Sequence, residues 1–277
     1  MINVRKSTIY FISAGFFFLA TITYAQQGLY TFCKDSGLTY EFRISGDIVY
    51  KMAGIESQNY KVETRGLLKM DLLETKEDVN VIKLIPSKTF VKLNDIILED
   101  ITTQETAISQ LISTSIIEIK KNGEVISSKE VTSGIVNLSQ TIRLIPAFPE
   151  ELSSGKRWKQ YLSSFNIPGL PMCNLAFLYL YTKENNNSAK VQLIANQPIK
   201  EKKKEGDVIM TFTGKNSSTG EFGFDEDKGE IKRFTGKFGL LLNVVFSLPP
   251  GPGKERSSQQ TMPLNLDVKL DVQMWKK

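Results

Sequence analysis

The chain has no histidine among its 277 residues. Histidine supplies the general base of Ser-His-Asp and Cys-His systems and is the commonest protein ligand to zinc, so these chemistries are excluded. The Gly-x-Ser-x-Gly elbow, the phosphate-binding P-loop and the dinucleotide-binding fingerprint are also missing from the sequence. Two cysteines are too few for a cysteine-rich metal site. We therefore expect a protein that is not an enzyme and that uses no cofactor and no metal.

Carboxylate pairs are the remaining acid–base chemistry, because glycosidases need only two acids. Nearly all of the 30 acidic residues fall on the polar side of predicted strands or in predicted turns, which is typical of solvated surface charge. The segment Asp225–Glu230 resembles the start of a calcium-binding loop but lacks the later bidentate glutamate. We interpret it as a charged hairpin turn, and the mixed-charge run Lys200–Glu205 as a solvated linker.

The N-terminus has the three parts of a secretory signal peptide in order. Arg5 and Lys6 are followed by an apolar run from Ile9 and by small residues at the cleavage positions before Gln26. An uncleaved membrane anchor is the alternative, but a spanning helix needs about 20 apolar residues and this run is slightly short. We predict residues 1–25 as a cleaved signal peptide and an exported protein that is periplasmic, cell-surface or secreted.

The mature chain, residues 26–277, has no second apolar run long enough to cross a bilayer as a helix. Cleavage leaves 33 basic and 30 acidic side chains, a net charge of +3 against +5 for the whole chain. Such a small, interspersed excess predicts no nucleic-acid binding. Cys33 and Cys173 either form one disulfide in an oxidising compartment or stay as two buried thiols.

Polar and apolar residues alternate over unusually long segments. The two clearest examples are residues 58–73, where Tyr60, Val62, Leu68, Met70 and Leu72 fall on one side, and residues 264–275, where every second residue from Leu264 to Met274 is apolar. Strict alternation predicts antiparallel strands with one dry and one wet face, and strands of this length twist and wrap. The fold prediction is therefore mainly β: one or more long, curled antiparallel sheets that form a half-barrel, a barrel or a sandwich.

Turn signals separate the strands. Asn122-Gly123 is the strongest short hairpin signal, and Asn185–Ser188 and Asp225–Gly229 also divide alternating runs. Helix signals are confined to two short segments, residues 102–112 and 137–142. A break near residues 143–150 divides the β-rich exported domain, residues 26–277, near its middle, so two sheet lobes are one arrangement that we consider.

The apolar side of the two long strands is the candidate ligand-binding surface. If the sheet curls around this side, its side chains line a concave surface that a ligand can cover. If two sheets pack face to face instead, the same side chains form an ordinary core. The candidate residues are Val62, Leu68, Met70, Leu72, Leu266, Val268 and Leu270.

Two motifs carry a family resemblance. A proline-containing segment that leads to Gly155-Lys156-Arg157-Trp158 is followed by Phe224-Asp225 and Lys228-Gly229-Glu230-Ile231. These motifs cover about a third of the mature chain and resemble those of uncharacterised bacterial exported β-rich proteins of unknown function. Such families are similar in architecture to the periplasmic lipoprotein-carrier half-barrels, in which a curled sheet holds an acyl chain. The resemblance implies lipid binding in the cell envelope and transfers no catalytic residue.

Two functional hypotheses follow. The first is a non-catalytic binding or carrier protein for a hydrophobic ligand or an envelope partner. The second is a structural or interaction module of the cell envelope that has no ligand pocket. They differ in whether the apolar side of the sheet remains accessible to a ligand.

Overall fold

A computed structural model describes residues 30, 37–52, 54, 56–99, 113–132, 143–163, 174–248 and 260–277. These residues form twelve β-strands and, within the described ranges, no helix. The mainly β prediction is confirmed. The two predicted helical segments, 102–112 and 137–142, lie outside the described residues. The strands are β1 (Leu38–Met52), β2 (Gln58–Lys76), β3 (Val79–Leu93), β4 (Ile96–Glu99), β5 (Ser115–Lys120), β6 (Val125–Glu130), β7 (Arg157–Ser163), β8 (Asn174–Lys183), β9 (Ser188–Glu205), β10 (Val208–Asp225), β11 (Glu230–Leu248) and β12 (Gln260–Lys276).

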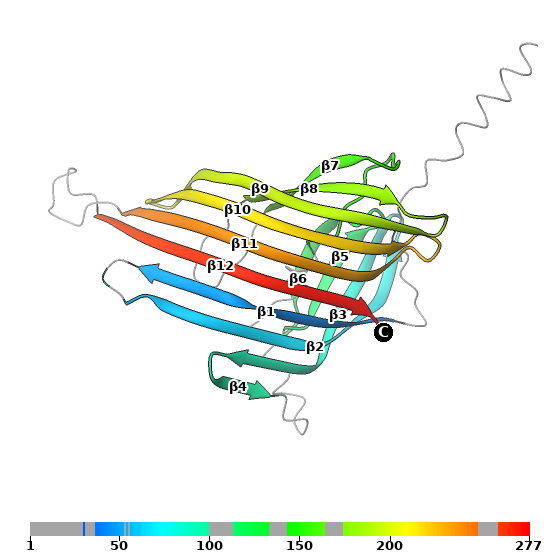
Figure 1. Ribbon diagram of the computed structural model, residues 1–277, viewed down its shortest axis with the longest axis horizontal. Coiled ribbons are helices and arrows are strands. Elements are labelled where there is room, and N and C mark those ends of the chain that lie inside the picture. Colours follow the sequence, from blue (N-terminus) through cyan, green and yellow to red (C-terminus); the bar gives the residue numbers. More distant parts are fainter. Residues whose placement is uncertain are drawn as a thin grey trace, which may run out of the picture.

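All twelve strands belong to one antiparallel sheet in the order β6-β5-β3-β2-β1-β12-β11-β10-β9-β8-β7, with β4 paired to β3. The sheet is not closed, because β6 and β7 stand at opposite ends of this order. Strands from both sides of residues 143–150 are joined by the pairing of β1 with β12. In Figure 1, β9 to β12, β1 and β2 form one broad layer, and the fainter β5 and β6 lie behind it.

The predicted hairpins are present. Asn122-Gly123 connects β5 to β6, and Gly123 has a positive φ of 97° that favours glycine. Gly229, with φ of 62°, ends the turn between β10 and β11. The linker interpretation of Lys200–Glu205 is wrong, since these residues pair with β10 as the end of β9. The charges do not prevent a strand, because residues 200–205 pair in register with Val208–Thr213 of β10, and Gly206 supplies the turn back.

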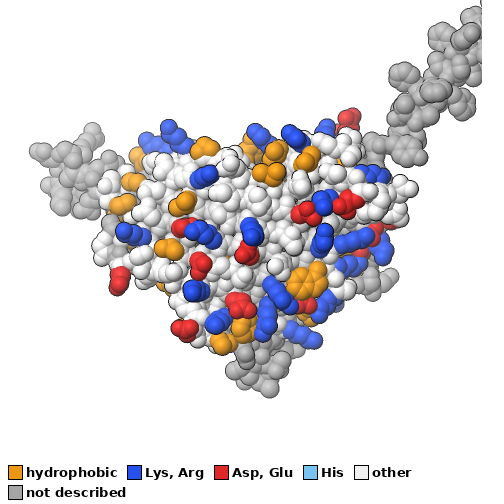
Figure 2. Space-filling view, viewed as in Figure 1, with side chains coloured by type: hydrophobic (Ala, Val, Ile, Leu, Met, Phe, Trp, Pro, Cys, Tyr) orange, Lys and Arg blue, Asp and Glu red, His pale blue; other side chains and the backbone are white. Residues whose placement is uncertain are grey.

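Each long strand has one dry and one wet face, as the alternation predicts. The face that carries the buried residues is called the inner face, and its core includes Phe177, Tyr179, Phe212 and Phe222. Figure 2, viewed from the same side as Figure 1, shows the outer face with Lys and Arg interspersed among Asp and Glu. Most of the buried apolar side chains therefore lie on one side of the sheet.

The two free edges of the sheet approach each other at one end, where residues 143–148 lie between them; we call these residues the bridging segment. The Arg143 guanidinium donates a hydrogen bond to Ser128 Oγ of β6 at 3.2 Å, and the Arg143 carbonyl accepts one from Gln160 Nε2 of β7 at 3.2 Å. Phe148 exchanges hydrogen bonds with Asn122 of the β5–β6 turn. The sheet is thus curled and bridged, although its edge strands do not pair.

Five aromatic side chains, one of them from the bridging segment itself, pack together on the inner face at this end: Tyr30, Phe148, Trp158, Tyr179 and Phe224, which we call the aromatic plug. Its ring centroids lie 5.2 to 5.9 Å apart, a spacing typical of attractive aromatic pairs. Tyr30 donates to the Pro146 carbonyl at 3.0 Å and Tyr179 to the Leu144 carbonyl at 2.9 Å. Burial raises the pKa of both phenols, so they remain neutral donors.

We predict that Gln160→Ala weakens the bridged end. Gln160 Oε1 accepts from the Ala147 N–H at 2.9 Å, and Nε2 donates to the carbonyls of Arg143 and Ile145. Their loss leaves backbone groups without these partners, so the free energy of unfolding should fall by about 1–3 kcal/mol. Urea denaturation measures the change. Gln273→Ala, on the exposed outer face of β12, should stay within about 0.5 kcal/mol; an equal loss in both variants contradicts the role of Gln160.

Candidate functional site

Cross-strand pairing aligns the inner-face side chains into rows that run across the sheet. One row passes from Val62 of β2 through Gly46 of β1 and Leu270 of β12 to Phe238 of β11. The next row contains Tyr60, Ile48 and Val268. Because neighbouring strands lie about 4.8 Å apart, side chains in these rows are in reach of one another and form a continuous wall.

The seven residues predicted to bind a ligand all lie on β2 and β12, the two strands that flank β1. Leu68, Met70, Leu266 and Val268 are buried in the core. The other three, Val62, Leu72 and Leu270, are half-buried. The row through Gly46 brings Val62 and Leu270 to either side of β1, whereas Leu68 and Met70 lie farther along β2, opposite Tyr40 and Leu38.

Half-buried apolar side chains gather where β2, β1 and β12 run side by side. We call this group the inner patch: Ile44, Ile48, Tyr50, Tyr60, Val62 and Leu270. It differs from the same face of β10 and β11, where Phe212, Phe234 and Val244 are fully buried. The inner patch is thus a part of the described inner face where apolar surface is still accessible, as it also is at Val208 and Phe246 near the ends of β10 and β11.

Sequence reasoning missed the β1 members of the inner patch. Ile44, Ile48 and Tyr50 lie at every second position, but Gly46 leaves the pattern without an apolar side chain and Val49 adds one on the polar side. The structure explains the interruption. A Cβ at position 46 would overlap the Lys269 carbonyl oxygen of β12, so only glycine permits this close approach of the two backbones. Gly46 therefore lies between Val62 of β2 and Leu270 of β12, where the backbones of β1 and β12 approach closely.

The carboxylates of the β10–β11 turn are engaged by neighbouring cations. Lys232 lies 3.2 Å from Asp225, Lys183 lies 3.3 Å from Glu226, and Lys276 contacts Glu230. In the part of the chain that the structure describes, no three Asp, Glu or Cys side chains come close enough to hold a metal ion. The geometry agrees with the interpretation of residues 225–230 as a charged hairpin turn.

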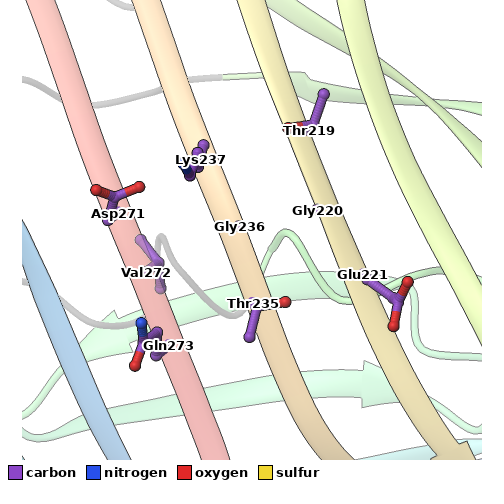
Figure 3. A pocket seen from close by; sticks show the side chains of 9 residues that line it. All are labelled: Thr219, Gly220, Glu221, Thr235, Gly236, Lys237, Asp271, Val272 and Gln273. Carbon is purple, nitrogen blue, oxygen red and sulfur yellow. The ribbon is translucent and has the colours of Figure 1, made fainter.

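The outer face also has a hollow, of about 320 Å³, across β10, β11 and β12 (Figure 3). Short side chains, Thr219 and Thr235, line it beside the charged Glu221, Lys237 and Asp271. Lys237 pairs in register with Asp271, and Glu221 contacts Lys190 and Arg233 at 3.4 Å. Opposite charges are therefore balanced within the hollow, which gives it no strong preference for a charged ligand.

Two sequence predictions fall outside the described residues. These are the signal peptide, residues 1–25, and the pairing of Cys33 with Cys173. Among the described residues, none belongs to a helix with the length and apolar character needed to cross a bilayer.

The fold and the inner patch define a β-protein built on one large, open antiparallel sheet with an apolar inner face. No family model matches the chain, and no curated protein sequence matches it. A solved structure entitled "Lipid-protein interactions in lipovitellin" is similar at a TM-score of 0.43 and 9% sequence identity. The match covers 88% of this chain and 25% of the lipovitellin chain, so the chain spans about a quarter of that protein's length.

The charged turn leads to a prediction about acid stability. Partial burial acts to raise the pKa of Asp225, but the Lys228 backbone N–H and the Lys232 ammonium outweigh it and hold the pKa below its ordinary value. Stabilisation by the carboxylate is therefore complete above the unfolded pKa of about 4 and is lost as the pH falls through the lower folded pKa. Asp225→Asn should lower the free energy of unfolding by about 1–2 kcal/mol at neutral pH.

Urea denaturation between pH 7 and pH 2 checks this expectation. The gap between the wild-type protein and Asp225→Asn should narrow as the pH falls below about 4. Asp207→Asn, in the exposed β9–β10 turn, is the matched control and should follow the wild type throughout. A gap that is constant across the whole pH range contradicts the assigned role of the Asp225 charge.

Proposed function

We propose that this chain is an exported, non-catalytic protein that binds or carries a hydrophobic ligand on the inner face of its sheet. The observation that carries the proposal is the inner patch, a group of half-buried apolar side chains on β2, β1 and β12. A ligand that covers this half-buried apolar surface stabilises the complex by about 25 cal/mol for every Å² of apolar area removed from water. Sites of this kind are typically concave and mostly apolar.

The shape of the inner patch favours a chain-like ligand. Along β1 it extends over the seven residues from Ile44 to Tyr50, or about 20 Å at the usual strand rise. Across the sheet it covers three strands, or about 10 Å between the outermost two. A long, narrow apolar strip suits the acyl chain of a lipid or lipoprotein better than a compact ligand.

The types of residue in the chain and in the inner patch support the non-catalytic part of this proposal. The chain has no histidine, and three carboxylates of the β10–β11 turn are engaged by lysines. The inner patch itself contains only aliphatic side chains and two tyrosines. Such a surface provides apolar contact and contains no carboxylate, amine or thiol.

Export rests on the predicted signal peptide and has a direct test. We expect the protein recovered from its host to have the intact mass of residues 26–277, with Gln26 as the first residue. If the recovered protein retains residues 1–25, the cleavage part of the proposal is wrong.

We predict that Ile48→Asn impairs ligand binding. Ile48 lies in the middle of the inner patch. Its replacement by asparagine removes apolar contact with the ligand. Complete burial of an isoleucine side chain contributes about 1.5–3 kcal/mol, which is the upper limit of the loss in binding free energy. The affinity for the apolar fluorophore 1-N-phenylnaphthylamine should fall about tenfold, measured by fluorescence titration. Circular dichroism should remain that of the wild type, because Ile48 is only partly buried.

The matched control is Val49→Asn, one residue along the same strand. Val49 points to the outer face and is also half-buried, so it tests the general effect of an asparagine in β1. Its affinity for the fluorophore should equal that of the wild type. Equal losses in both variants, or no binding by the wild type, contradict a ligand site on the inner face.

A further inference from the structure

A groove runs between the two free edges of the sheet, beside the bridging segment; we call it the edge groove. Its volume is about 430 Å³, within the range of about 300–1,000 Å³ that is typical of ligand sites. Glu124 and Val125, where β6 begins, line one side, and five consecutive residues of β7, Trp158–Leu162, line the other. Arg143 and Ala147 of the bridging segment complete it.

The edge groove follows the backbone of an edge strand. Among the twelve described strands, β7 pairs only with β8, and β6 pairs only with β5. Among the described residues, the bridging segment is tied to β7 through the side chain of Gln160, and no backbone hydrogen bond between the two occurs. Among the described residues, one side of the β7 backbone is therefore left without a partner strand and faces the groove, as the free edge of a sheet does toward an added strand.

Side chains along β7 indicate what kind of strand would pair there. Arg157 and Lys159 are exposed, and Tyr161, on the same face, is 70% exposed. On the opposite side of the groove, Glu124 is paired with Lys120 at 2.7 Å. The exposed charge along β7 is thus positive and is interrupted by a large aromatic surface, which complements a strand with acidic and apolar residues.

We propose that the edge groove binds an extended acidic segment of a partner protein as an additional strand along β7. Main-chain hydrogen bonds to the free edge supply the affinity, and acidic side chains beside Arg157 and Lys159 supply the selectivity. This interaction is separate from the hydrophobic ligand on the inner face. The edge groove is thus a second binding surface, specific for an extended peptide, between the two edges of the open sheet.

The test uses the mature chain and three fluorescein-labelled synthetic decapeptides. The first alternates Glu and Val, the second alternates Lys and Val, and the third is the Glu–Val peptide with every backbone amide methylated. Fluorescence polarisation measures each dissociation constant. The Glu–Val peptide should bind at least tenfold more tightly than the methylated peptide, since several main-chain hydrogen bonds of about 1 kcal/mol each are lost on methylation. It should also bind at least tenfold more tightly than the Lys–Val peptide.

Two matched charge reversals locate the site. Lys159→Glu should weaken binding of the Glu–Val peptide about fivefold, consistent with an exposed ion pair worth up to about 1 kcal/mol. Lys237→Glu, in the hollow of the outer face (Figure 3), should leave it unchanged. Hydrogen exchange should slow in residues 157–163 when the Glu–Val peptide is added. Binding of 1-N-phenylnaphthylamine should be the same in both variants.

Several results overturn the proposal. Equal affinity for the methylated peptide excludes main-chain pairing, and equal effects of the two charge reversals exclude the edge groove as the site. The proposal is also contradicted if the Glu–Val peptide shows no saturable binding up to about 1 mM, a dissociation constant that corresponds to a binding free energy of about −4 kcal/mol. A stable dimer in sedimentation that protects residues 157–163 without peptide contradicts it too, because a second copy then occupies the edge. None of these results bears on the inner patch.

Discussion

Gln160 holds the bridging segment against β7 with three hydrogen bonds, while Arg143 and Phe148 reach β6 and the β5–β6 turn from the same segment. These contacts keep the two free edges of a twelve-stranded sheet together without pairing them. An open sheet with one apolar face must otherwise leave that face in contact with water. The aromatic plug removes water from the bridged end of the inner face, and the rest of the fold depends on this closure.

Burial then decreases along β1 and β2, from Tyr40 and Leu68 toward the inner patch. Four of the five side chains of the aromatic plug and most inner-face side chains of β8 to β11 are buried, whereas the inner patch is half-buried. Gly46 lies within this region, where the backbones of β1 and β12 approach closely. The curvature that brings the two edges together thus also shapes the inner patch. We propose that a hydrophobic ligand binds there. Stability and binding use different parts of one continuous apolar surface.

The sequence predicts a good part of this fold because period-two alternation is a local signal. It locates β2 and β12, and Asn122-Gly123 locates the hairpin between β5 and β6. It does not reveal that β9 continues through Lys200–Glu205, because the charges of that run are compatible with a linker until their pairing with β10 is known. The adjacency of β1 and β12, the first and last strands, is a long-range pairing that no local pattern encodes.

The sequence likewise predicts only part of the candidate site. Alternation places all seven predicted residues on the apolar side of β2 and β12, but it does not distinguish Leu266, which is buried, from Leu270, which is half-buried. That difference depends on how the curled sheet covers each row. The β1 residues Ile48 and Tyr50 were missed as site residues because Gly46 interrupts the pattern, although the same glycine permits the close approach of β1 to β12.

The central claim is that the inner face of this open sheet carries a hydrophobic ligand. Native mass spectrometry of the protein purified from its own host in detergent-free buffer, followed by lipid extraction, tests it most directly. The account predicts a species heavier than residues 26–277 alone, whose extra mass is released as an acyl-chain lipid. A spectrum with only the mass of the free chain, and an extract without lipid, contradicts the account.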